Sequence, residues 1–375
     1  MIDSQKKKMI LLSGSGDTVA WFRLDLLKEF QKNSYEVFVL APDIREDLRP
    51  LLDEMEIHFI SIKLHRKGFS LPNLIYSIFE LRKLFFSIKP DLILSYTHKA
   101  IVAGSIAARF SQFKNIYSLI TGTGHLFDDN NKKEKFIKFV GVQALKISLK
   151  FNKVIFFQNP DDKKLFLTNK IVTIKQARLV NGSGINLEKF KISSLPADPI
   201  FLCMARLIKS KGLYEYAKAA KLVKEQHSNA RFLLYGYPDH HKDSIDEVEI
   251  QEHWFKKYGI EYFGYASDPV AAIKQCNVFV LLSYKEGTPR VVLEAMAMGR
   301  PIITTMTPGC KETVIEGVNG FLVPKHDFKL TANAMINLMD KDLRFSMGAE
   351  SRAYCEKKFN VKDININMLS EMKII

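Results

Sequence analysis

Two glutamates in the segment EGTPRVVLEAMAMGRPIITT, residues 286–305, have a spacing that suits sugar binding. Glu286 follows the continuous apolar run NVFVLLS, which predicts a buried strand, and Glu294 lies further on in an apolar helical pattern. Glu286 is therefore expected at the carboxyl end of a strand, and Glu294 on the second turn of a helix with its side chain directed toward the helix N-terminus. Because a carboxylate accepts hydrogen bonds from vicinal hydroxyls, we predict that one glutamate binds a ribose and the other a second sugar.

The residues between the two glutamates predict how the helix begins. Thr288 is the predicted N-cap, and Pro289 takes the favoured first helical position. Free N–H groups at a helix start attract phosphate, so Gly287 and Thr288 join the predicted ligand-binding residues. Two surface glutamates can fall at this spacing by chance. The preceding strand, Gly287, Pro289 and the following strand pattern GRPIITT favour a functional pair instead.

A glycine-rich loop, SGSGD at residues 13–17, follows the first predicted strand. Gly14 and Gly16 allow the backbone to approach a diphosphate or a sugar closely. The loop lacks both the G-x-G-x-x-G spacing of dinucleotide-binding loops and the lysine of a P-loop. The sequence therefore predicts neither NAD binding nor ATP hydrolysis.

The elements that position these residues alternate between strands and helices. Strand patterns at MILLSG, YEVFVLAP, IHFISI and PDLILSYT are separated by a loop and amphipathic helix over 14–33 and by a helix over 71–88, and a second alternating run begins at PIFLCMARL. The stretch NGSGINLEKFKISSLPADP between the runs has the composition of a linker. We predict an α/β protein of two doubly wound, Rossmann-like domains that face a central cleft. The predicted bounds are 1–190, 191–354 and a C-terminal helix over 355–375 that could pack back on the first domain.

The quoted segments resemble a known family. EGTPRVVLEAMAMGRPIITT, MARLIKSKGL and VNGSGINLEKF are similar to the retaining glycosyltransferases of family four, whose two-domain architecture is called GT-B. SGSGDTVAWFRLDLLKEF and ITGTGHLF resemble bacterial members that build surface glycans on a polyprenyl-diphosphate carrier. TPGCKETVIEG resembles the glycine turn of the family, with Pro308 and Gly309 in place of a double glycine.

The resemblance implies roles for further residues. Arg206 and Lys211, in MARLIKSKG, would bind the donor diphosphate and offset the charge of the leaving nucleotide, and Gly16 would lie against the donor phosphates. Hydrogen bonds to charged groups contribute roughly 1.5 to 3 kcal/mol each, which suits this task. The expected donor is a UDP-sugar, with no cofactor. We expect no metal site, because the pair His240–His241 shows no third ligand.

An active-site histidine near the donor sugar is a further implication of the resemblance. His125 in TGTGHLF follows the predicted strand NIYSLIT, and His98 in SYTHKA ends an earlier one. We favour His125 over His98, while a lone loop histidine is often only a hydrogen-bonded surface residue. The acceptor hydroxyl is expected to lose its proton to a donor phosphate oxygen.

The bulk composition bounds the compartment and the partners. The chain has a net charge of +14 in 375 residues, which indicates an acidic partner: nucleic acid, an anionic membrane or a phosphorylated small molecule. No apolar run is long enough to span a bilayer or to form a secretory signal. We therefore expect a cytoplasmic protein bound peripherally to the inner face of the cell membrane, with Cys203, Cys276, Cys310 and Cys355 reduced and buried.

Two segments are candidates for membrane contact. Residues 131–153 combine apolar residues at helical spacing with lysines along one side. This segment is either a basic amphipathic helix on an anionic membrane or an internal helix of the first domain. Residues 64–72, LHRKGFSLP, form a second basic and aromatic stretch that could flank an acceptor site.

The leading interpretation is a metal-independent, retaining transferase. It would move a hexose or N-acetylhexosamine from a UDP-sugar to a polyprenyl-diphosphate-linked saccharide in surface glycan synthesis. One alternative is a UDP-N-acetylglucosamine epimerase of similar architecture, which needs no acceptor. Another is a basic nucleic-acid-binding protein, although no RRM, KH, helix-turn-helix or zinc-finger pattern is present.

Overall fold

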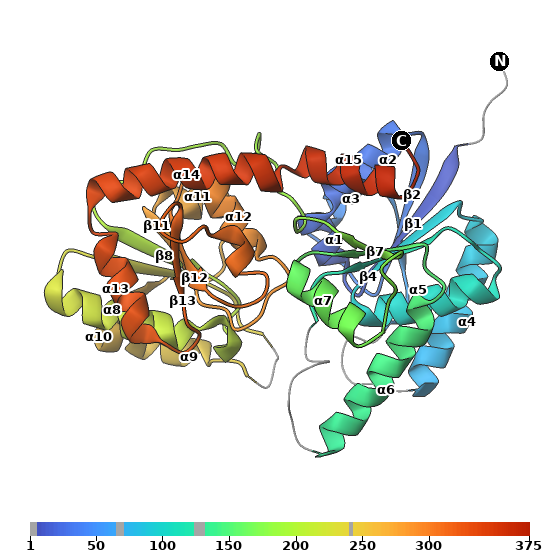
Figure 1. Cartoon of the computed structure of the whole chain (residues 1–375), viewed down its shortest axis with the longest axis horizontal. Coiled ribbons are helices and arrows are strands. Elements are labelled where there is room, and N and C mark those ends of the chain that lie inside the picture. Colours follow the sequence, from blue (N-terminus) through green and yellow to red (C-terminus); the bar gives the residue numbers. More distant parts are fainter. Residues whose placement is uncertain (1–5, 65–70, 124–131, 240–242) are drawn as a thin grey trace. The chain divides into compact units, whose positions relative to one another are not determined.

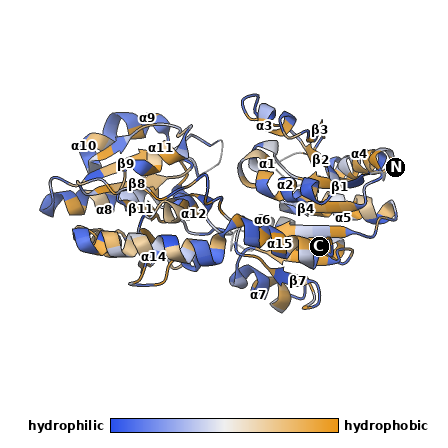
Figure 2. Cartoon of the chain, turned by 90° about the horizontal axis from the view of Figure 1, so that it is seen from above, coloured by the Kyte–Doolittle hydropathy of each residue, from blue (hydrophilic) through white to orange (hydrophobic). Residues whose placement is uncertain are grey.

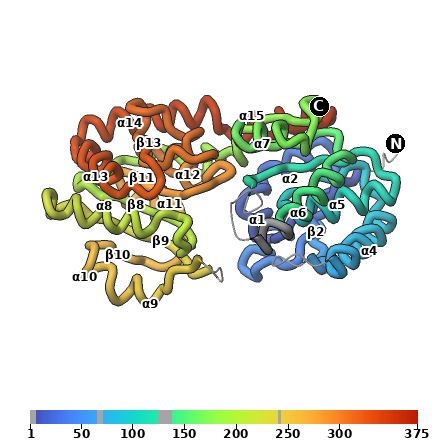
Figure 3. Tube along the Cα trace, turned by 60° about the horizontal axis from the view of Figure 1, so that its bottom comes forward, coloured from blue at the N-terminus to red at the C-terminus, as the bar shows by residue number. Residues whose placement is uncertain are grey.

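The chain forms two compact units (Figure 1). The computed structural model describes residues 6–64, 71–123, 132–239 and 243–375, with the backbone alone for residues 132–137. The first unit comprises Met1–Ser183 and Val361–Ile375, and the second comprises Gly184–Asn360. The chain therefore passes between the units twice, and Figure 3 traces both passages along the sequence colours.

The unit boundaries differ from the bounds 190/191 and 354/355 that the sequence suggested. The Ile185 N–H donates to the Phe359 carbonyl at 2.8 Å, and Ile185 forms a parallel bridge with Asn360. Phe190 is buried in the second unit, and helix α14 (Lys341–Phe359) continues without interruption to the second passage. Residues 184–190 and 355–360 therefore belong to the second unit.

A seven-stranded parallel sheet forms the centre of the first unit. Its strand order is β3-β2-β1-β4-β5-β6-β7, and Met9 lies opposite both Val37 and Leu92. The strands are β1 (Lys7–Leu12), β2 (Tyr35–Ala41), β3 (His58–Ser61), β4 (Leu92–Tyr96), β5 (Ile116–Ile120), β6 (Val154–Phe157) and β7 (Ala177–Leu179). These strands read as continuous apolar runs because helices cover both faces of the sheet.

The helices of the first unit are divided between the two faces. Met9 and Leu11 pack toward α2 and α15, whereas Ile10 and Leu12 pack toward α4 and α5, as the alternation of a strand requires. The helices are α1 (Gly16–Phe22), α2 (Leu24–Lys32), α3 (Arg49–Asp53), α4 (Leu71–Ile88), α5 (His98–Phe110), α6 (Lys132–Leu149), α7 (Pro160–Thr168) and α15 (Val361–Glu371). The helix predicted over 71–88 is thus confirmed.

The loop and amphipathic helix predicted over 14–33 correspond to a short loop and two helices, which meet at Arg23. This residue takes φ −126° and ψ −4° between α1 and α2. Its side chain is buried, and its guanidinium lies 5.3 Å from the centre of the Tyr96 ring. Arg23 and Tyr96 are far apart in sequence, so the local pattern of apolar residues does not reveal where the helix is interrupted.

The last helix, α15, returns to the first unit and packs beside α2 (Figure 1). Its side chains Ile364, Met368 and Leu369 are buried in the same cluster as the strand residues Met9 and Leu11. The Tyr117 hydroxyl donates to the Met372 carbonyl at 3.1 Å, just beyond the helix. Residues 361–375 therefore complete the core of the first unit.

The second unit repeats the architecture with a six-stranded parallel sheet of order β10-β9-β8-β11-β12-β13. Its strands are β8 (Ile200–Met204), β9 (Arg231–Tyr235), β10 (Ile260–Tyr262), β11 (Val278–Leu281), β12 (Ile302–Thr305) and β13 (Gly320–Val323). Its α-helices are α8 (Leu213–Gln226), α9 (Glu247–Glu249), α10 (Phe255–Tyr258), α11 (Pro269–Lys274), α12 (Arg290–Ala297), α13 (Phe328–Asn337) and α14. Short helical turns cover Lys209–Lys211, Ile250–Trp254 and Lys311–Thr313.

The second sheet is also covered on both faces. Phe201 and Cys203 pack toward α8 and α13, and Leu202 and Met204 pack toward α11, α12 and α14. All four cysteines are buried and unpaired by disulfides, as predicted. Burial raises the pKa of the Cys203 thiol to about 12, so this group is inert toward oxidation and metal binding.

Within the segment 131–153, Lys132–Leu149 forms α6, whose second half packs inside the first unit. Leu145 and Leu149 are fully buried against Ile101 of α5, whereas Phe139 and Ile147 are exposed. Of the two alternatives for this segment, the second half of α6 therefore fits the internal helix of the first domain. Most of the basic stretch at 64–72 lies outside the described residues. None of the helices in the described ranges is long and apolar enough to cross a membrane.

Candidate active site

Both sheets have the strand order 3-2-1-4 at their centre, which creates a topological switch point. In the second unit the switch point lies between β8 and β11. The helix after β8, α8, packs on one face of the sheet, and the helix after β11, α12, packs on the other. The loops that follow the two strands diverge, and open α/β sheets bind ligands at such a point. The loops carry five predicted residues: Arg206 and Lys211 after β8, and Glu286, Gly287 and Thr288 after β11.

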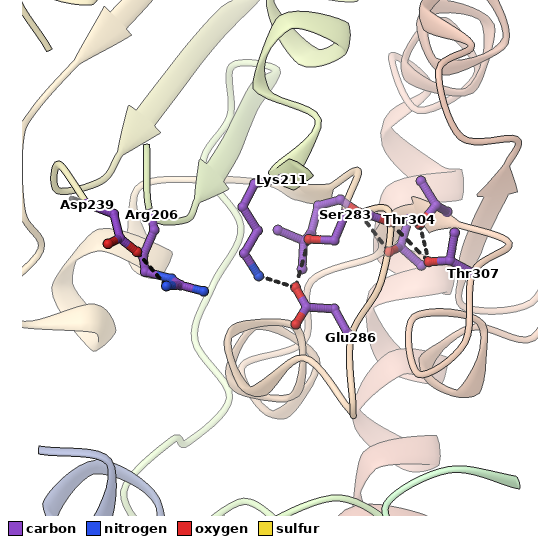
Figure 4. Close-up of polar contacts among 9 residues, drawn as sticks. Arg206, Lys211, Asp239, Ser283, Glu286, Thr304 and Thr307 are labelled. Atoms are coloured by element: carbon purple, nitrogen blue, oxygen red, sulfur yellow. Dashed lines mark hydrogen bonds and ion pairs between the residues drawn. The ribbon is translucent and has the colours of Figure 1, made fainter. Parts of the chain in front are cut away.

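Lys211 and Glu286 form an ion pair across this switch point (Figure 4). The Lys211 ammonium donates to Oε1 of Glu286, and the Ser283 hydroxyl donates to the same oxygen at 2.7 Å. The two charged side chains are only 16% and 17% exposed. A pair this far out of water attracts more strongly than a surface pair, so each group holds the other in place.

The turn that carries Lys211 is fixed by a glycine. Gly212 has φ +69°, and a Cβ at this position would lie 2.3 Å from the Leu282 carbonyl oxygen. The N–H of Tyr284 also donates to the Ser210 carbonyl at 2.9 Å. The turn after β8 therefore rests directly on the end of β11, which places Lys211 beside Glu286.

The loop that carries Glu286 is attached to the neighbouring strand β12. The hydroxyls of Thr305 and Thr307 donate to the Ser283 carbonyl at 2.5 and 3.0 Å (Figure 4 labels Thr307). Gly309, with φ +79°, packs against the other side of the loop, where a Cβ would meet the Gly287 carbonyl at 2.3 Å. The turn with Pro308 and Gly309 thus packs directly against the backbone of the Glu286 loop.

Arg206 lies in the same view but pairs with a different carboxylate (Figure 4). Its guanidinium donates to Asp239, which follows β9, at 2.5 Å. The Arg206 side chain is 46% exposed, so this pair is weak and can be exchanged for a stronger anion. The structure therefore places the two predicted diphosphate-binding cations after the same strand, each with its own carboxylate partner.

Glu294 is buried on α12 and pairs with Arg290 one turn before it. The Arg290 Nε lies 3.4 Å from the Glu294 carboxylate, and the Glu294 side chain is 11% exposed. Burial raises the pKa of Glu294, while the positive charges of Arg290 and Lys189 oppose the increase. No described contact joins Glu294 to Glu286. That both carboxylates bind one ligand therefore stays a prediction.

The predicted start of α12 is wrong by one residue. Pro289 is the N-cap, with φ −72° and ψ 108°, and Arg290 is the first helical residue. The Thr288 hydroxyl donates to the Gly287 carbonyl at 3.0 Å rather than capping the helix. The Pro289 carbonyl accepts the N–H of Val292 at 3.1 Å, as the carbonyl of an N-cap residue does.

The switch point of the first unit lies between β1 and β4 and carries Gly14, Gly16 and His98. A Cβ at Gly14 would lie 2.8 Å from the Thr97 hydroxyl, so the glycine loop lies against the end of β4. Gly16 has a packing role: its N–H donates to the Asp43 carbonyl at 2.8 Å, and a Cβ would lie 2.5 Å from the same oxygen. The amide of Gly16 is therefore bonded within the fold, and the approach of Gly16 to the donor phosphates stays a prediction.

Thr97 and His98 form a strained corner at the start of α5. Thr97 has φ +71°, an unusual value for a β-branched residue, and His98 is the first residue of the helix. Such strain is often found at functional sites. His125, the favoured histidine, lies outside the described residues, as do His240 and His241.

Several supporting residues were not predicted from the sequence. Ser283, Asp239 and Arg290 each bond to a predicted residue. Asp239 had a detectable signal, because it follows a predicted strand as an acidic residue. Ser283 and Arg290 had none beyond their position beside the two glutamates.

Two family models match the chain. Residues 184–358 match the model described as glycosyl transferases group 1, and residues 9–159 match the model described as glycosyl transferase 4-like. Between them the models account for most of both units. The chain therefore belongs to these glycosyltransferases, and its fold is GT-B, as the resemblance implied.

Two of the relatives are bacterial enzymes. A Campylobacter jejuni N,N'-diacetylbacillosaminyl-diphospho-undecaprenol α-1,3-N-acetylgalactosaminyltransferase is 27% identical over 351 residues, covering 90% of each chain. An Escherichia coli UDP-Gal:α-D-GlcNAc-diphosphoundecaprenol α-1,3-galactosyltransferase is 24% identical, over 92% of this chain and 95% of that one.

The fold also matches solved structures. An Anabaena protein crystallised with UDP and glucose has a TM-score of 0.78 at 18% identity, over 99% of this chain and 100% of that one. At this identity the likeness shows the fold alone. None of these findings supports the epimerase or the nucleic-acid-binding alternative.

Proposed function

We propose that this glycosyltransferase moves a hexose or N-acetylhexosamine from a UDP-sugar to a polyprenyl-diphosphate-linked saccharide. The supporting observation is the Lys211–Glu286 pair at the β8/β11 switch point, which joins an anion-binding cation to a hydroxyl-binding carboxylate. The substrate class follows the Campylobacter and Escherichia relatives, whose names specify undecaprenyl-diphosphate-linked sugars.

The cations act on the donor diphosphate. Arg206 and Lys211 exchange carboxylate partners for phosphate oxygens, whose growing charge they stabilise as the UDP leaves. The N–H groups of Gly14, Gly287 and Thr288 are further candidate donors to the diphosphate or the transferred sugar. Because two side-chain cations serve this purpose, the reaction needs no divalent metal.

The carboxylates act on the two sugars. Glu294, held on α12, accepts hydrogen bonds from the ribose hydroxyls, and Glu286 contacts the transferred sugar or the charge that develops on its ring. Release of Lys211 to the diphosphate opens one acceptor position on Oε1 of Glu286 for a sugar hydroxyl, beside the bond that this oxygen accepts from Ser283. Donor binding therefore replaces one ion pair with two new contacts.

Retention of configuration completes the proposal. UDP-galactose is an α-glycoside, and the Escherichia relative is named for an α-1,3 product, which together support retention. The acceptor hydroxyl then attacks from the face that UDP leaves, and a donor phosphate oxygen takes its proton. The family resemblance implies a histidine near the donor sugar, and His125 and His98 are the two candidates.

One experiment tests the whole proposal. Purified protein is incubated with single UDP-sugars and a detergent-solubilised polyprenyl-diphosphate saccharide mixture, with and without excess EDTA. UDP release that requires acceptor, persists in EDTA and yields an α-linkage by NMR supports it. UDP-sugar consumption without acceptor would indicate an epimerase or hydrolase, and loss of activity that magnesium restores would contradict metal independence.

Contact with the membrane is a separate part of the proposal. Helix α4 exposes the large apolar side chains Leu71, Ile75, Phe79 and Phe86 to solvent, and Figure 2 shows the hydropathy of this helix. The spacing of four between the first three places them along one side of the helix. Such a stripe suits insertion at the interface of a bilayer.

Basic groups accompany this stripe. Lys63 lies 5.5 Å from the Tyr76 ring, and Arg82 lies 5.8 Å from the Phe86 ring. Each such cation near an anionic surface contributes on the order of 1 kcal/mol to binding. We therefore propose that α4, rather than α6, contacts the inner face of the cell membrane.

Vesicle flotation tests the membrane contact. Ile75→Ser/Phe79→Ser should reduce binding to vesicles of anionic phospholipid, while Ile174→Ser, at an exposed apolar residue on another segment, should not. Equal binding by all three proteins would contradict the proposal.

A further inference from the structure

Arg290 stands at an unfavourable position for a cation. It is the first residue of α12, where the helix macrodipole is positive, and its side chain is only 12% exposed. A buried cation at a helix start needs specific partners. The described partners include the carboxylate of Glu294 and the carbonyl oxygen of Gly184, to which the guanidinium donates at 2.8 Å.

Gly184 gives this arginine a fixed backbone anchor. It is the first residue of the second unit, with φ +69°, and the next residue, Ile185, is hydrogen-bonded to Phe359. Arg290 thus connects the buried carboxylate to a backbone segment that the β-bridge between Ile185 and Asn360 holds in place. The fork geometry of a guanidinium allows both contacts, whereas an ammonium would favour one.

We propose that Arg290 is a positioning residue, which holds the Glu294 carboxylate charged and oriented for the ribose by tethering it to Gly184. This inference rests on the proposed function, in which Glu294 accepts hydrogen bonds from the ribose. Arg290 itself need not touch the nucleotide.

The charges around Glu294 support this role. Burial raises the pKa of Glu294, and Arg290 is the foremost opposing influence, with Lys189 the second. From α14, which packs on α12, Arg352 reaches the carbonyls of Phe190 and Ala297, and Lys358 bonds to Glu312. Arg290 is therefore the cation whose removal most affects the charge of Glu294.

The direction of the pH effect follows. Without the Arg290 charge, the pKa of Glu294 rises further, so the carboxylate takes up its proton at a higher pH. A protonated carboxyl loses acceptor capacity for the ribose hydroxyls. Arg290→Gln should therefore weaken UDP binding most at the acid end of the pH range and less at the alkaline end.

Calorimetric titration of the full chain with UDP, from acid to alkaline pH, provides the test. We expect Arg290→Gln to raise the dissociation constant relative to wild type on the order of tenfold at acid pH, and by a smaller factor at alkaline pH. The ratio of variant to wild type cancels the protonation of UDP itself. Arg290→Lys restores the charge and should recover the wild-type pH dependence with part of the affinity.

Arg352→Gln is the matched control, because this arginine also donates to backbone carbonyls but belongs to α14. It should leave the pH dependence unchanged. A ratio for Arg290→Gln that is constant with pH, or a control that shifts equally, would overturn the inference. If Arg290→Gln does not fold, Arg290→Lys decides: a pH dependence unlike wild type would also overturn it. Wild-type protein without UDP affinity at any pH would overturn the proposed function, and the inference with it.

Discussion

At the scale of single residues, the Lys211–Glu286 pair is the feature that most restricts the mechanism. The two residues are 75 positions apart and share one oxygen, Oε1 of Glu286, with the Ser283 hydroxyl. Truncation of one charge leaves the other partly buried without its partner. The effects of substitutions at the two positions should therefore not add.

Lys211→Ala should lower kcat by about 100-fold, because the charge of the leaving UDP loses a stabilising donor. Acceptor KM should change little, since the acceptor hydroxyl does not meet this cation. In the double variant with Glu286→Gln, we expect a coupling of roughly 0.5 to 3 kcal/mol relative to the sum of single effects. Steady-state kinetics of both single variants and the double variant measure this coupling free energy. Lys209→Ala, at an exposed lysine in the same turn, is the control, and additive effects would argue against a shared role.

The two glutamates should separate binding from turnover. Glu294→Gln should raise the dissociation constant of free UDP, because UDP contains the ribose. Glu286→Gln should leave UDP binding nearly intact and reduce sugar transfer, because the transferred sugar is absent from UDP. Calorimetry with UDP and single-turnover rates distinguish these outcomes. The opposite pattern would reverse the assigned roles.

At the scale of elements, glycines decide how closely the loops of the site approach one another. Gly309 and Gly317 both have positive φ, at +79° and +73°. A Cβ at Gly309 would meet the Gly287 and Glu286 carbonyls at 2.3 and 2.5 Å, whereas a Cβ at Gly317 would meet nothing within 4 Å. The two positions thus share a backbone conformation and differ in crowding.

Gly317→Ala should lower the free energy of unfolding by about 1–2 kcal/mol, the cost of a left-handed non-glycine residue. Gly309→Ala should cost more, because the Glu286 loop must also move. Only Gly309→Ala should reduce sugar transfer, since the displaced loop carries Glu286. Denaturant unfolding and initial rates for both variants provide the comparison. Equal stability losses with unchanged activity would show that Gly309 does not position the loop.

At the scale of the whole molecule, the second unit is continuous in sequence and the first is not. Arg206, Lys211, Glu286 and Glu294 all belong to the second unit. The first unit needs α15, whose Ile364, Met368 and Leu369 complete its core. Fully burying each such side chain stabilises the fold by about 1.5–3 kcal/mol.

Residues 184–360 produced alone should therefore fold and bind UDP within about tenfold of the full chain, a difference of about 1.4 kcal/mol. Residues 1–183 alone should unfold at lower temperature than the same residues joined to 361–375 by a short linker. Circular dichroism melting and UDP calorimetry check both expectations. An isolated 184–360 fragment that folds without UDP affinity would place essential donor contacts in the first unit.

The sequence by itself determined the alternation of strands and helices and the class of protein. Strands such as NVFVLLS are buried on both faces, so the apolar pattern that identifies them is contained in consecutive residues. The position of Lys211 after a strand and before Gly212 is equally local. Strand order could not be derived in this way, because it depends on contacts between distant segments.

The tertiary structure decided which residues of the site meet. Lys211 contacts Glu286, Arg206 contacts Asp239, and Arg290 contacts Gly184, although the members of the last pair are 106 positions apart. The break at Arg23 depends on neighbours in space, and the start of α12 after Pro289 depends on backbone hydrogen bonds. Local patterns identify the residues that can carry charge, but the order of strands in each sheet selects their partners, because that order brings the ends of non-consecutive strands together.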